Sequence, residues 1–247
     1  MNTTIVSGCS WSNRDYFSRV HPTWDTSQYK KWDELLEHHY GWNIVNLSEN
    51  ALGNQEMIRR ATEKTYCENV ERIIIPLSQW YRFSTPGGYK FHPNGVIDPM
   101  PVHWDNEVTE QRKKDHNKWT KRQTDYFELL PFSDRMQKDL VETTLFEILR
   151  LIDLCKYKNI ELIIFQMIEP NIKESLIDEV YTNQHFKIIS ESKNTRLFGW
   201  PFFVELGGMS FWNEMNSDML ISEYDGHPNG EGHQKIFELF KGYYKNV

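Results

Sequence analysis

The hexapeptide RIIIPL, at residues 72–77, has three consecutive isoleucines at its centre. A continuous apolar run of this length is typical of a strand in a parallel sheet that is covered on both faces. Such a strand requires helices on either side of it in the sequence. The flanking segments alternate between strand and helix patterns, so we expect 72–77 to form an inner strand of an α/β domain.

Other strand and helix patterns extend in both directions from this segment. We predict further strands at 5–6, 43–47 and 160–167, and helices at 31–36, 55–66, 136–156 and 236–243. Between residues 170 and 194 we expect one more helix and a short strand at 186–189, while the aromatic segment 197–220 has no clear pattern. The alternation predicts a three-layer α/β/α sandwich around a mostly parallel sheet, with right-handed crossovers.

The segment from Phe83 to about Arg135 interrupts this alternation. It begins with several prolines and glycines and continues with a mixed-charge stretch. It is too long to be an ordinary loop, so we expect an insertion or lid. No Pro/Gly/Ser-rich linker divides the rest, and residues 1–247 are predicted to form one domain.

Composition and charge exclude several classes of protein. The formal net charge of −7 argues against nucleic acid and membrane surfaces as partners. The apolar content is only 39%, but 9 Trp, 12 Tyr and 14 Phe supply large buried areas, so we expect an ordered core. Three widely spaced cysteines and no recognisable signal peptide or membrane span predict reduced thiols and a cytoplasmic location. The oligomeric state is not indicated.

Ligands of parallel α/β sheets bind at the carboxyl ends of the strands, and the first such end carries Gly8-Cys9-Ser10. A serine there points toward the ligand edge, and the glycine before it allows a tight turn. Two interpretations of Ser10 stay open: it is a nucleophile, or its hydroxyl satisfies backbone groups of the turn. Cys9 is a weaker candidate because adjacent turn residues project in different directions.

The loop before the last helix contains Asp225-Gly226-His227-Pro228-Asn229. Pro228 keeps His227 out of the helical conformation. An aspartate two residues before a histidine can accept its Nδ1 proton, which leaves Nε2 free to receive a proton from a serine. The alternative is that Asp225 and Asn229 only cap the final helix.

Gly53 and Asn54 follow the second predicted strand. Their amides are candidate donors to a developing oxyanion, and the alternative is an ordinary turn with a helix cap. A metal site formed by Asp225, His227 and His233 lacks a standard ligand spacing, so we predict no metal and no organic cofactor.

The order of these blocks resembles that of the SGNH/GDSL hydrolase superfamily, and the resemblance spans the chain. It rests on Gly8-Cys9-Ser10, the segment from Asn46 to Asn54, the strand end Ser78-Gln79-Trp80-Tyr81-Arg82, and the block at 225–229. The sequence looks closest to compact members found in bacteriophage and marine bacterial genomes. The resemblance implies Ser10 as nucleophile and first oxyanion amide, Gly53 as second oxyanion amide, His227 as general base and Asp225 as its orienting carboxylate.

Three positions depart from the family pattern. Cys9 replaces an aspartate, the spacing is Asp-x-His instead of Asp-x-x-His, and Ser78-Gln79-Trp80 replaces Gly-x-Asn-Asp. The usual oxyanion asparagine is therefore missing, and Asn54 or Gln79 is a candidate substitute. Loss of one such donor costs about 3 kcal/mol of transition-state stabilisation, so we expect low activity or none.

The sequence therefore predicts a serine esterase without a cofactor that removes a small acyl group, such as acetyl, from a small-molecule or glycan ester. We expect the substrate to contact Trp11, Trp80, Arg82 and Trp200, which lie at these turns or in the late aromatic segment. Two other functions stay open. An SGNH-fold binding protein with little or no activity would explain the altered third block, and an O-acyltransferase would use the same chemistry in a site that excludes water.

Overall fold

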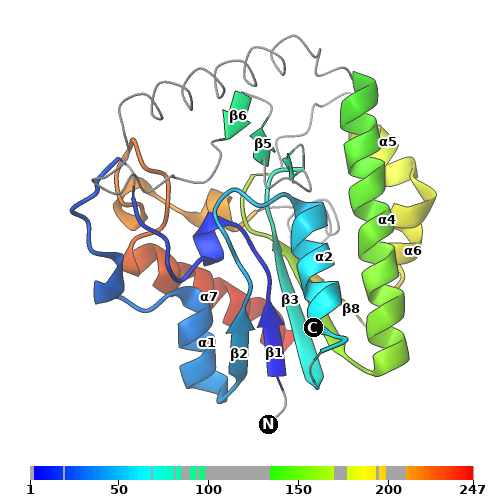
Figure 1. The fold of residues 1–247 in the computed structure, drawn as a ribbon, viewed down its shortest axis with the longest axis horizontal. Helices are drawn as coiled ribbons and strands as arrows, with labels where there is room; N and C mark the ends of the chain where they lie inside the picture. Colours follow the sequence, from blue (N-terminus) through cyan, green and yellow to red (C-terminus); the bar gives the residue numbers. More distant parts are fainter. Residues whose placement is uncertain are drawn as a thin grey trace, which may run out of the picture.

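A computed structural model describes residues 3–18, 20–67, 69–80, 82–84, 90–92, 95–97, 134–169, 177–192, 195–198 and 210–246. Its main sheet has five strands, all parallel, in the order β2-β1-β3-β7-β8 (Figure 1). The strands are β1 (Thr3–Val6), β2 (Asn43–Asn46), β3 (Val70–Leu77), β7 (Glu161–Gln166) and β8 (Thr195–Phe198). The predicted parallel sheet is confirmed, and the isoleucine-rich strand β3 lies at its centre.

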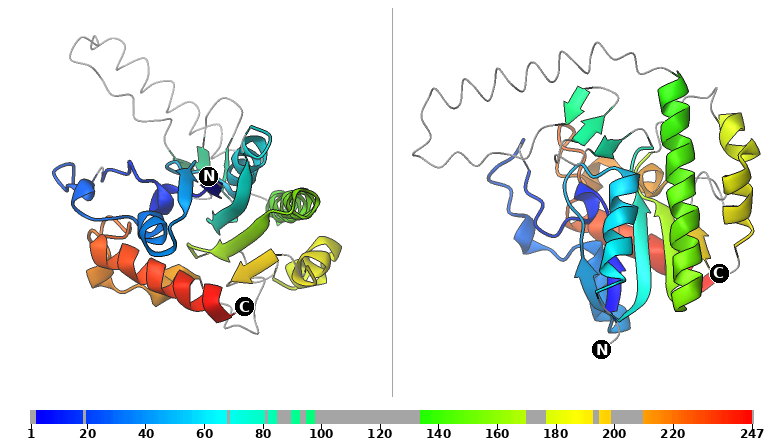
Figure 2. Two further views of the ribbon diagram at one scale, coloured as in Figure 1. Left: turned by 90° about the horizontal axis from the view of Figure 1, so that it is seen from below. Right: turned by 45° about the vertical axis from the view of Figure 1, so that its right-hand side comes forward.

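Helices cover both faces of this sheet (Figure 2). One face carries α1 (Trp32–Tyr40) and α7 (Gly230–Asn246), which contact each other. The other carries α2 (Asn54–Lys64) and the long helix α4 (Asp134–Lys158), against which α6 (Gln184–Ser190) packs; α5 (Ile177–Thr182) contacts α6. The predicted three-layer α/β/α sandwich is therefore confirmed.

Aromatic side chains fill the core between the sheet and the helices α1 and α7. Phe165 of β7 stacks on Phe211 with ring centroids 4.6 Å apart, and meets the edge of Trp32 at 5.7 Å. Phe240 of α7 lies 5.8 Å from Phe165. Large aromatic rings thus supply buried apolar area that the few aliphatic residues do not provide.

One predicted strand is wrong. Residues 186–189 belong to helix α6, and the fifth strand is β8. Asn183 caps this helix by accepting a hydrogen bond from the backbone N–H of His185 at 2.8 Å. Phe186 and Ile189, three positions apart, are buried on one helix face, while Ile188 is exposed. A four-residue apolar run does not distinguish a strand from such a helix.

The small antiparallel sheet β4-β5-β6 lies in the segment predicted as an insertion. Its strands are β4 (Phe83–Ser84), β5 (Lys90–His92) and β6 (Gly95–Ile97). Most of the remaining predicted insertion lies outside the described residues. No described helix is long and apolar enough to cross a membrane.

The strand order creates a reversal point between β1 and β3. The chain passes from β1 through α1 to β2 on one side, and returns through α2, on the other face of the sheet, to β3 beside β1. Parallel α/β sheets bind ligands at the carboxyl ends of the strands next to such a point. Ser10 follows β1 and residues 78–82 follow β3, so both segments flank it.

Candidate active site

Ser10 opens the 3-10 turn Ser10–Ser12, directly after β1. Its neighbours face inward: Cys9 is fully buried, Trp11 packs on Trp212 with ring centroids 5.1 Å apart, and Ser12 accepts a hydrogen bond from the Trp32 indole at 3.3 Å. Ser10 itself is partly exposed. The neighbouring side chains are buried, so Ser10 carries the accessible hydroxyl of this turn.

His227 lies in the loop that leads into α7. Backbone pairing holds this loop: the N–H of Ile221 donates to the His227 carbonyl at 2.8 Å, and Leu220 forms an antiparallel bridge with Pro228. Asn229 caps α7 by accepting hydrogen bonds from the N–H groups of Glu231 and Gly232. The helix cap is thus Asn229, which leaves Asp225 free for His227.

The structure brings Ser10, His227 and Asp225 together in one hydrogen-bonded chain. His227 Nε2 lies 2.7 Å from Ser10 Oγ, and His227 Nδ1 lies 2.5 Å from an oxygen of Asp225. The Asp225 side chain is almost completely buried, whereas about a quarter of the His227 side chain is exposed. This arrangement lets Nε2 accept the Ser10 proton while Asp225 holds the proton on Nδ1.

Two further side chains surround Asp225. The Tyr16 hydroxyl lies 3.0 and 3.1 Å from the two carboxylate oxygens and 2.8 Å from His227 Nδ1, and its ring stacks on the His227 ring at 4.0 Å. Ser18 donates a short hydrogen bond to Asp225. Burial alone would raise the pKa of Asp225, but hydrogen bonds from His227, Ser18 and Tyr16 and the electrostatic interaction with His227 hold that pKa well below its ordinary value.

The predicted oxyanion donors Gly53 and Asn54 lie at the start of α2, and Gln79 follows β3. Gly53 precedes α2, and its loop lies beside the Ser10 turn because Gly8 N–H donates to Ser48 Oγ at 2.9 Å. The Asn54 side chain is buried and its carbonyl accepts the backbone N–H of Ser78 at 2.8 Å. This amide therefore ties α2 to the end of β3. The side-chain carbonyl of Gln79 accepts a hydrogen bond from Arg82 Nη2 at 3.0 Å.

Two of the predicted substrate contacts belong to the core. Trp11 is 3% exposed, and Trp80 is fully buried with its indole N–H on Gln166 at 2.9 Å. Both rings pack inside the protein in this structure, and contact of either with a substrate stays a prediction. Arg82 stays at the carboxyl end of β3, and Trp200 lies outside the described residues.

The candidate site thus combines a Ser-His-Asp chain with turns that meet at the reversal point of a parallel sheet. Two solved structures have similar folds. TesA superposes with a TM-score of 0.53 at 12% sequence identity, covering 99% of this chain and 98% of that one. This chain has the fold of the SGNH/GDSL hydrolases. A protein assigned to the G-D-S-L family of lipolytic proteins, from Desulfitobacterium hafniense DCB-2, superposes at 0.50 with 13% identity, covering 98% and 99%.

These superpositions show an SGNH/GDSL-like fold. No protein-family model matches the sequence, and no curated protein matches it. Among the described residues, no group of three or more His, Cys, Asp or Glu side chains is placed to hold a metal ion.

Tyr16 and Ser18 were not found by sequence reasoning. They lie in the irregular segment after the Ser10 turn, and more than 200 positions separate them from Asp225. A tyrosine and a serine in an irregular loop carry no periodic or spacing signal. Only the meeting of this loop with the loop before α7 reveals their contacts.

Proposed function

We propose that this SGNH-fold protein is a serine hydrolase of carboxylic esters. The observation that carries the proposal is the chain of hydrogen bonds from Ser10 Oγ through His227 to Asp225. Its donors hold the pKa of Asp225 well below its ordinary value, and an ionised carboxylate at this position favours a proton on Nδ1 of the neighbouring imidazole.

In the proposed reaction, Ser10 Oγ attacks the ester carbonyl while its proton passes to His227 Nε2. The imidazolium then donates that proton to the departing alkoxide, which leaves an acyl group on Ser10. A water molecule next gives a proton to Nε2 and attacks the acyl carbon, and the release of the carboxylic acid restores the Ser10 hydroxyl. Asp225 stabilises the imidazolium in both halves of the reaction.

The proposed oxyanion donors are the backbone N–H groups of Ser10 and Gly53. The Asn54 side chain is engaged with Ser78, so we assign it a supporting role at the end of β3. Without a side-chain donor, the activation free energy would be about 3 kcal/mol higher than with a full set of oxyanion donors, and the reaction correspondingly slower. This predicts a slow esterase that acts best on esters with a small acyl group and a good leaving group. Hydrolysis of acetyl esters of carbohydrates stays a prediction, which a panel of ester substrates would test.

The test is labelling with a fluorophosphonate, measured by intact mass. Ser10 attack on phosphorus with loss of fluoride should give one adduct, and the adduct should disappear in Ser10→Ala and fall strongly in His227→Ala. Ser27→Ala is the matched control, because the exposed Ser27 hydroxyl also donates to a carboxylate, Asp25 at 2.6 Å, and its described contacts include no histidine. Folded protein without an adduct, or labelling that survives Ser10→Ala, contradicts the proposal.

A further inference from the structure

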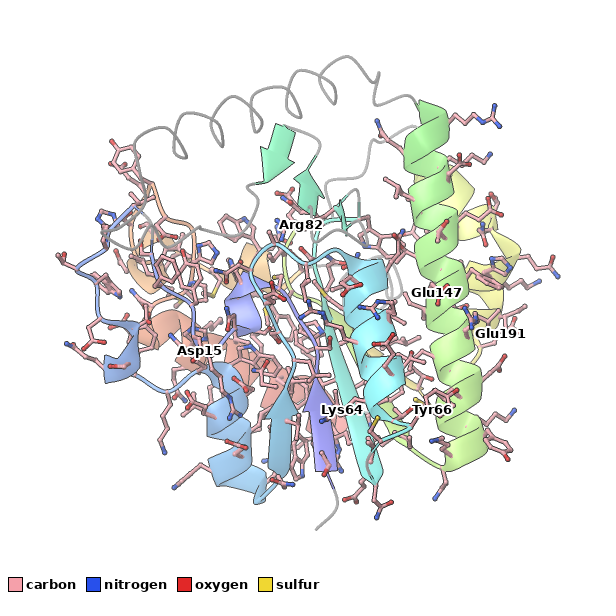
Figure 3. The ribbon with its side chains drawn as sticks, in the orientation of Figure 1. Asp15, Lys64, Tyr66, Arg82, Glu147 and Glu191 are labelled. Carbon is pink, nitrogen blue, oxygen red and sulfur yellow. The ribbon has the colours of Figure 1, made fainter. Side chains whose placement is uncertain are left out.

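Arg82 lies at the carboxyl end of β3, on the opposite side of the reversal point from Ser10. Figure 3 shows it above the ends of the central strands, beneath the small sheet. The turn after β3 holds it there, since the Arg82 backbone N–H donates to the Gln79 carbonyl at 3.2 Å. Ser10 lies in the turn that follows β1, the strand paired with β3, so the two polar segments follow adjacent strand ends.

The charge of Arg82 has no carboxylate partner among the described residues. Its Nη2 donates to the side-chain carbonyl of Gln79, a neutral group, and its Nε is shielded from solvent without a hydrogen-bond partner. Burial lowers the pKa of Arg82, as expected for a cation that no carboxylate of the described residues compensates, and Cys9, next to Ser10, acts against this shift.

Other arginines of this chain show the usual arrangement. Arg14 pairs with Asp33 at 2.6 Å, Arg72 with Glu161 at 2.6 Å, and Arg60 with Glu49 at 2.6 Å. Desolvating a guanidinium is costly unless an anion compensates it, so buried arginines are normally paired. Among the described residues, Arg82 lacks such a carboxylate partner, and it lies at the edge of the sheet where parallel α/β folds generally bind ligands.

A second polar group at the same strand end also lacks a partner. Ser78 is fully buried, and its Oγ has no hydrogen-bond partner among the described residues. Its backbone groups are satisfied by Asn54 and Gln166, so the hydroxyl is the remaining unsatisfied donor. Hydroxyl and guanidinium groups both donate hydrogen bonds to carboxylate and phosphate oxygens.

We propose that Arg82, assisted by the Ser78 hydroxyl, binds a negatively charged group of the substrate, so that the esters which this site takes are anionic. A carboxylate is the simplest group that fits, because the planar guanidinium presents two parallel N–H donors to it. The anion would supply the partner that the chain itself does not provide. That the ligand is an ester rests on the proposed function. That the site binds an anion is argued from Arg82 and Ser78 alone.

The test is binding of matched charged and neutral esters to the Ser10→Ala protein, measured by calorimetry. One pair is 4-acetoxybenzoate and its methyl ester, with the charge on the alcohol side. The other is 4-nitrophenyl hemisuccinate and its methyl ester, with the charge on the acyl side. We expect the charged member of at least one pair to bind roughly 10- to 100-fold more tightly, the range for hydrogen bonds to a charged group.

Replacing Arg82 should remove this preference. Ser10→Ala/Arg82→Gln is expected to bind the charged and neutral members about equally, and Arg82→Met serves if the glutamine variant does not fold. Adding Arg59→Gln to Ser10→Ala is the control, because the Arg59 side chain is 55% exposed and paired with Glu56, and the preference should survive. Equal binding in both pairs, no binding of the charged probes at millimolar concentration, or a preference that survives Arg82→Gln would overturn the inference.

Turnover by the wild-type protein separates this inference from the proposed function. Tight binding of a charged ester to Ser10→Ala, without hydrolysis by the wild type, would retain the anion site and reject the esterase. Hydrolysis of the neutral esters with no charge preference in binding would retain the esterase and reject the anion site.

Discussion

The Asp225 carboxylate is the residue on which the proposed chemistry depends most. It receives hydrogen bonds from His227, Tyr16 and Ser18, and each of these donors favours its ionised form. The stacked ring of Tyr16 also limits how far the His227 imidazole can rotate away from Ser10. Tyr16 is therefore a positioning residue in the proposed reaction, because it acts through Asp225 and His227.

Tyr16→Phe should keep the stacking and remove the hydroxyl. We expect kcat for ester hydrolysis to fall roughly 10-fold with little change in KM, since a hydrogen bond to a charged group contributes about 1.5–3 kcal/mol and the ring still restrains His227. Steady-state kinetics on a small activated ester measures this split. Tyr224→Phe, at an exposed tyrosine, is the control. An unchanged kcat in Tyr16→Phe would show that the hydroxyl has no part in positioning.

At the scale of elements, the Ser10 turn depends on the close approach of β1 and β3. A Cβ added at Gly8 would lie 2.6 Å from Pro76 Cγ of β3 and 2.7 Å from Ser12 Oγ. Both neighbours are held in place, because Pro76 lies within a paired strand and Ser12 bonds the Trp32 indole. Any side chain at this position must displace the turn that carries Ser10.

Gly8→Ala should therefore lower the free energy of unfolding by about 1–3 kcal/mol, the usual cost of overpacking, and should slow fluorophosphonate labelling. Gly242→Ala is the matched control: a Cβ there, within α7, meets nothing within 4 Å, and alanine in a helix is expected to stabilise by about 0.5–1 kcal/mol. Urea unfolding of the two variants measures the contrast. Equal stabilities would mean that the turn adjusts without cost.

At the scale of the whole molecule, His233 joins α7 to α1, two helices far apart in the sequence. It lies in α7, is almost completely buried, and its Nδ1 accepts the backbone N–H of Trp32, the first residue of α1, at 3.4 Å. This role requires the neutral ring. Burial, followed by the nearby charges of Lys31 and His227, lowers the pKa of His233 well below its ordinary value.

This lowered pKa makes part of the stability dependent on pH. As pH falls below about 6.5, the unfolded chain protonates His233 while the folded protein does not, so stability decreases with acidity. One proton accounts for at most about 2 kcal/mol at pH 5. Between pH 7.5 and pH 5, the free energy of unfolding of His233→Gln should therefore fall by less than that of the wild type, as measured by urea titration. The control is His38→Gln, at an exposed histidine, whose free energy of unfolding should fall by as much as that of the wild type. Equal losses in wild type and His233→Gln would contradict this assignment.

The aromatic core gives a second prediction at this scale. Phe165 is fully buried between Trp32, Phe211 and Phe240, which come from three separate parts of the chain. Phe165→Ala should lower the free energy of unfolding by about 3–5 kcal/mol through lost burial and the cavity that remains. Tyr157→Ala, at a residue that is 87% exposed, should change it by less than about 0.5 kcal/mol. A small effect at Phe165 would mean that the core collapses around the gap.

Sequence alone determined the features that depend on neighbours along the chain. The isoleucine-rich strand at 72–77, the spaced apolar positions of the helix at 136–156 and the alternation of the two patterns were enough to predict the layers and the parallel sheet. The predicted edge of that sheet also singled out Ser10, Asp225 and His227, because the carboxyl ends of parallel strands are always on the same side.

Only the tertiary structure decided which side chains meet across that edge. Trp11 and Trp80 turn inward, Asn54 bonds to the end of β3, and Tyr16 reaches Asp225 from a loop 209 positions away. The physical reason is that periodicity specifies the buried face of a helix or strand, but loops have no period. The direction of a loop side chain, and the lack of a carboxylate partner for Arg82 among the described residues, depend on how the elements pack against one another.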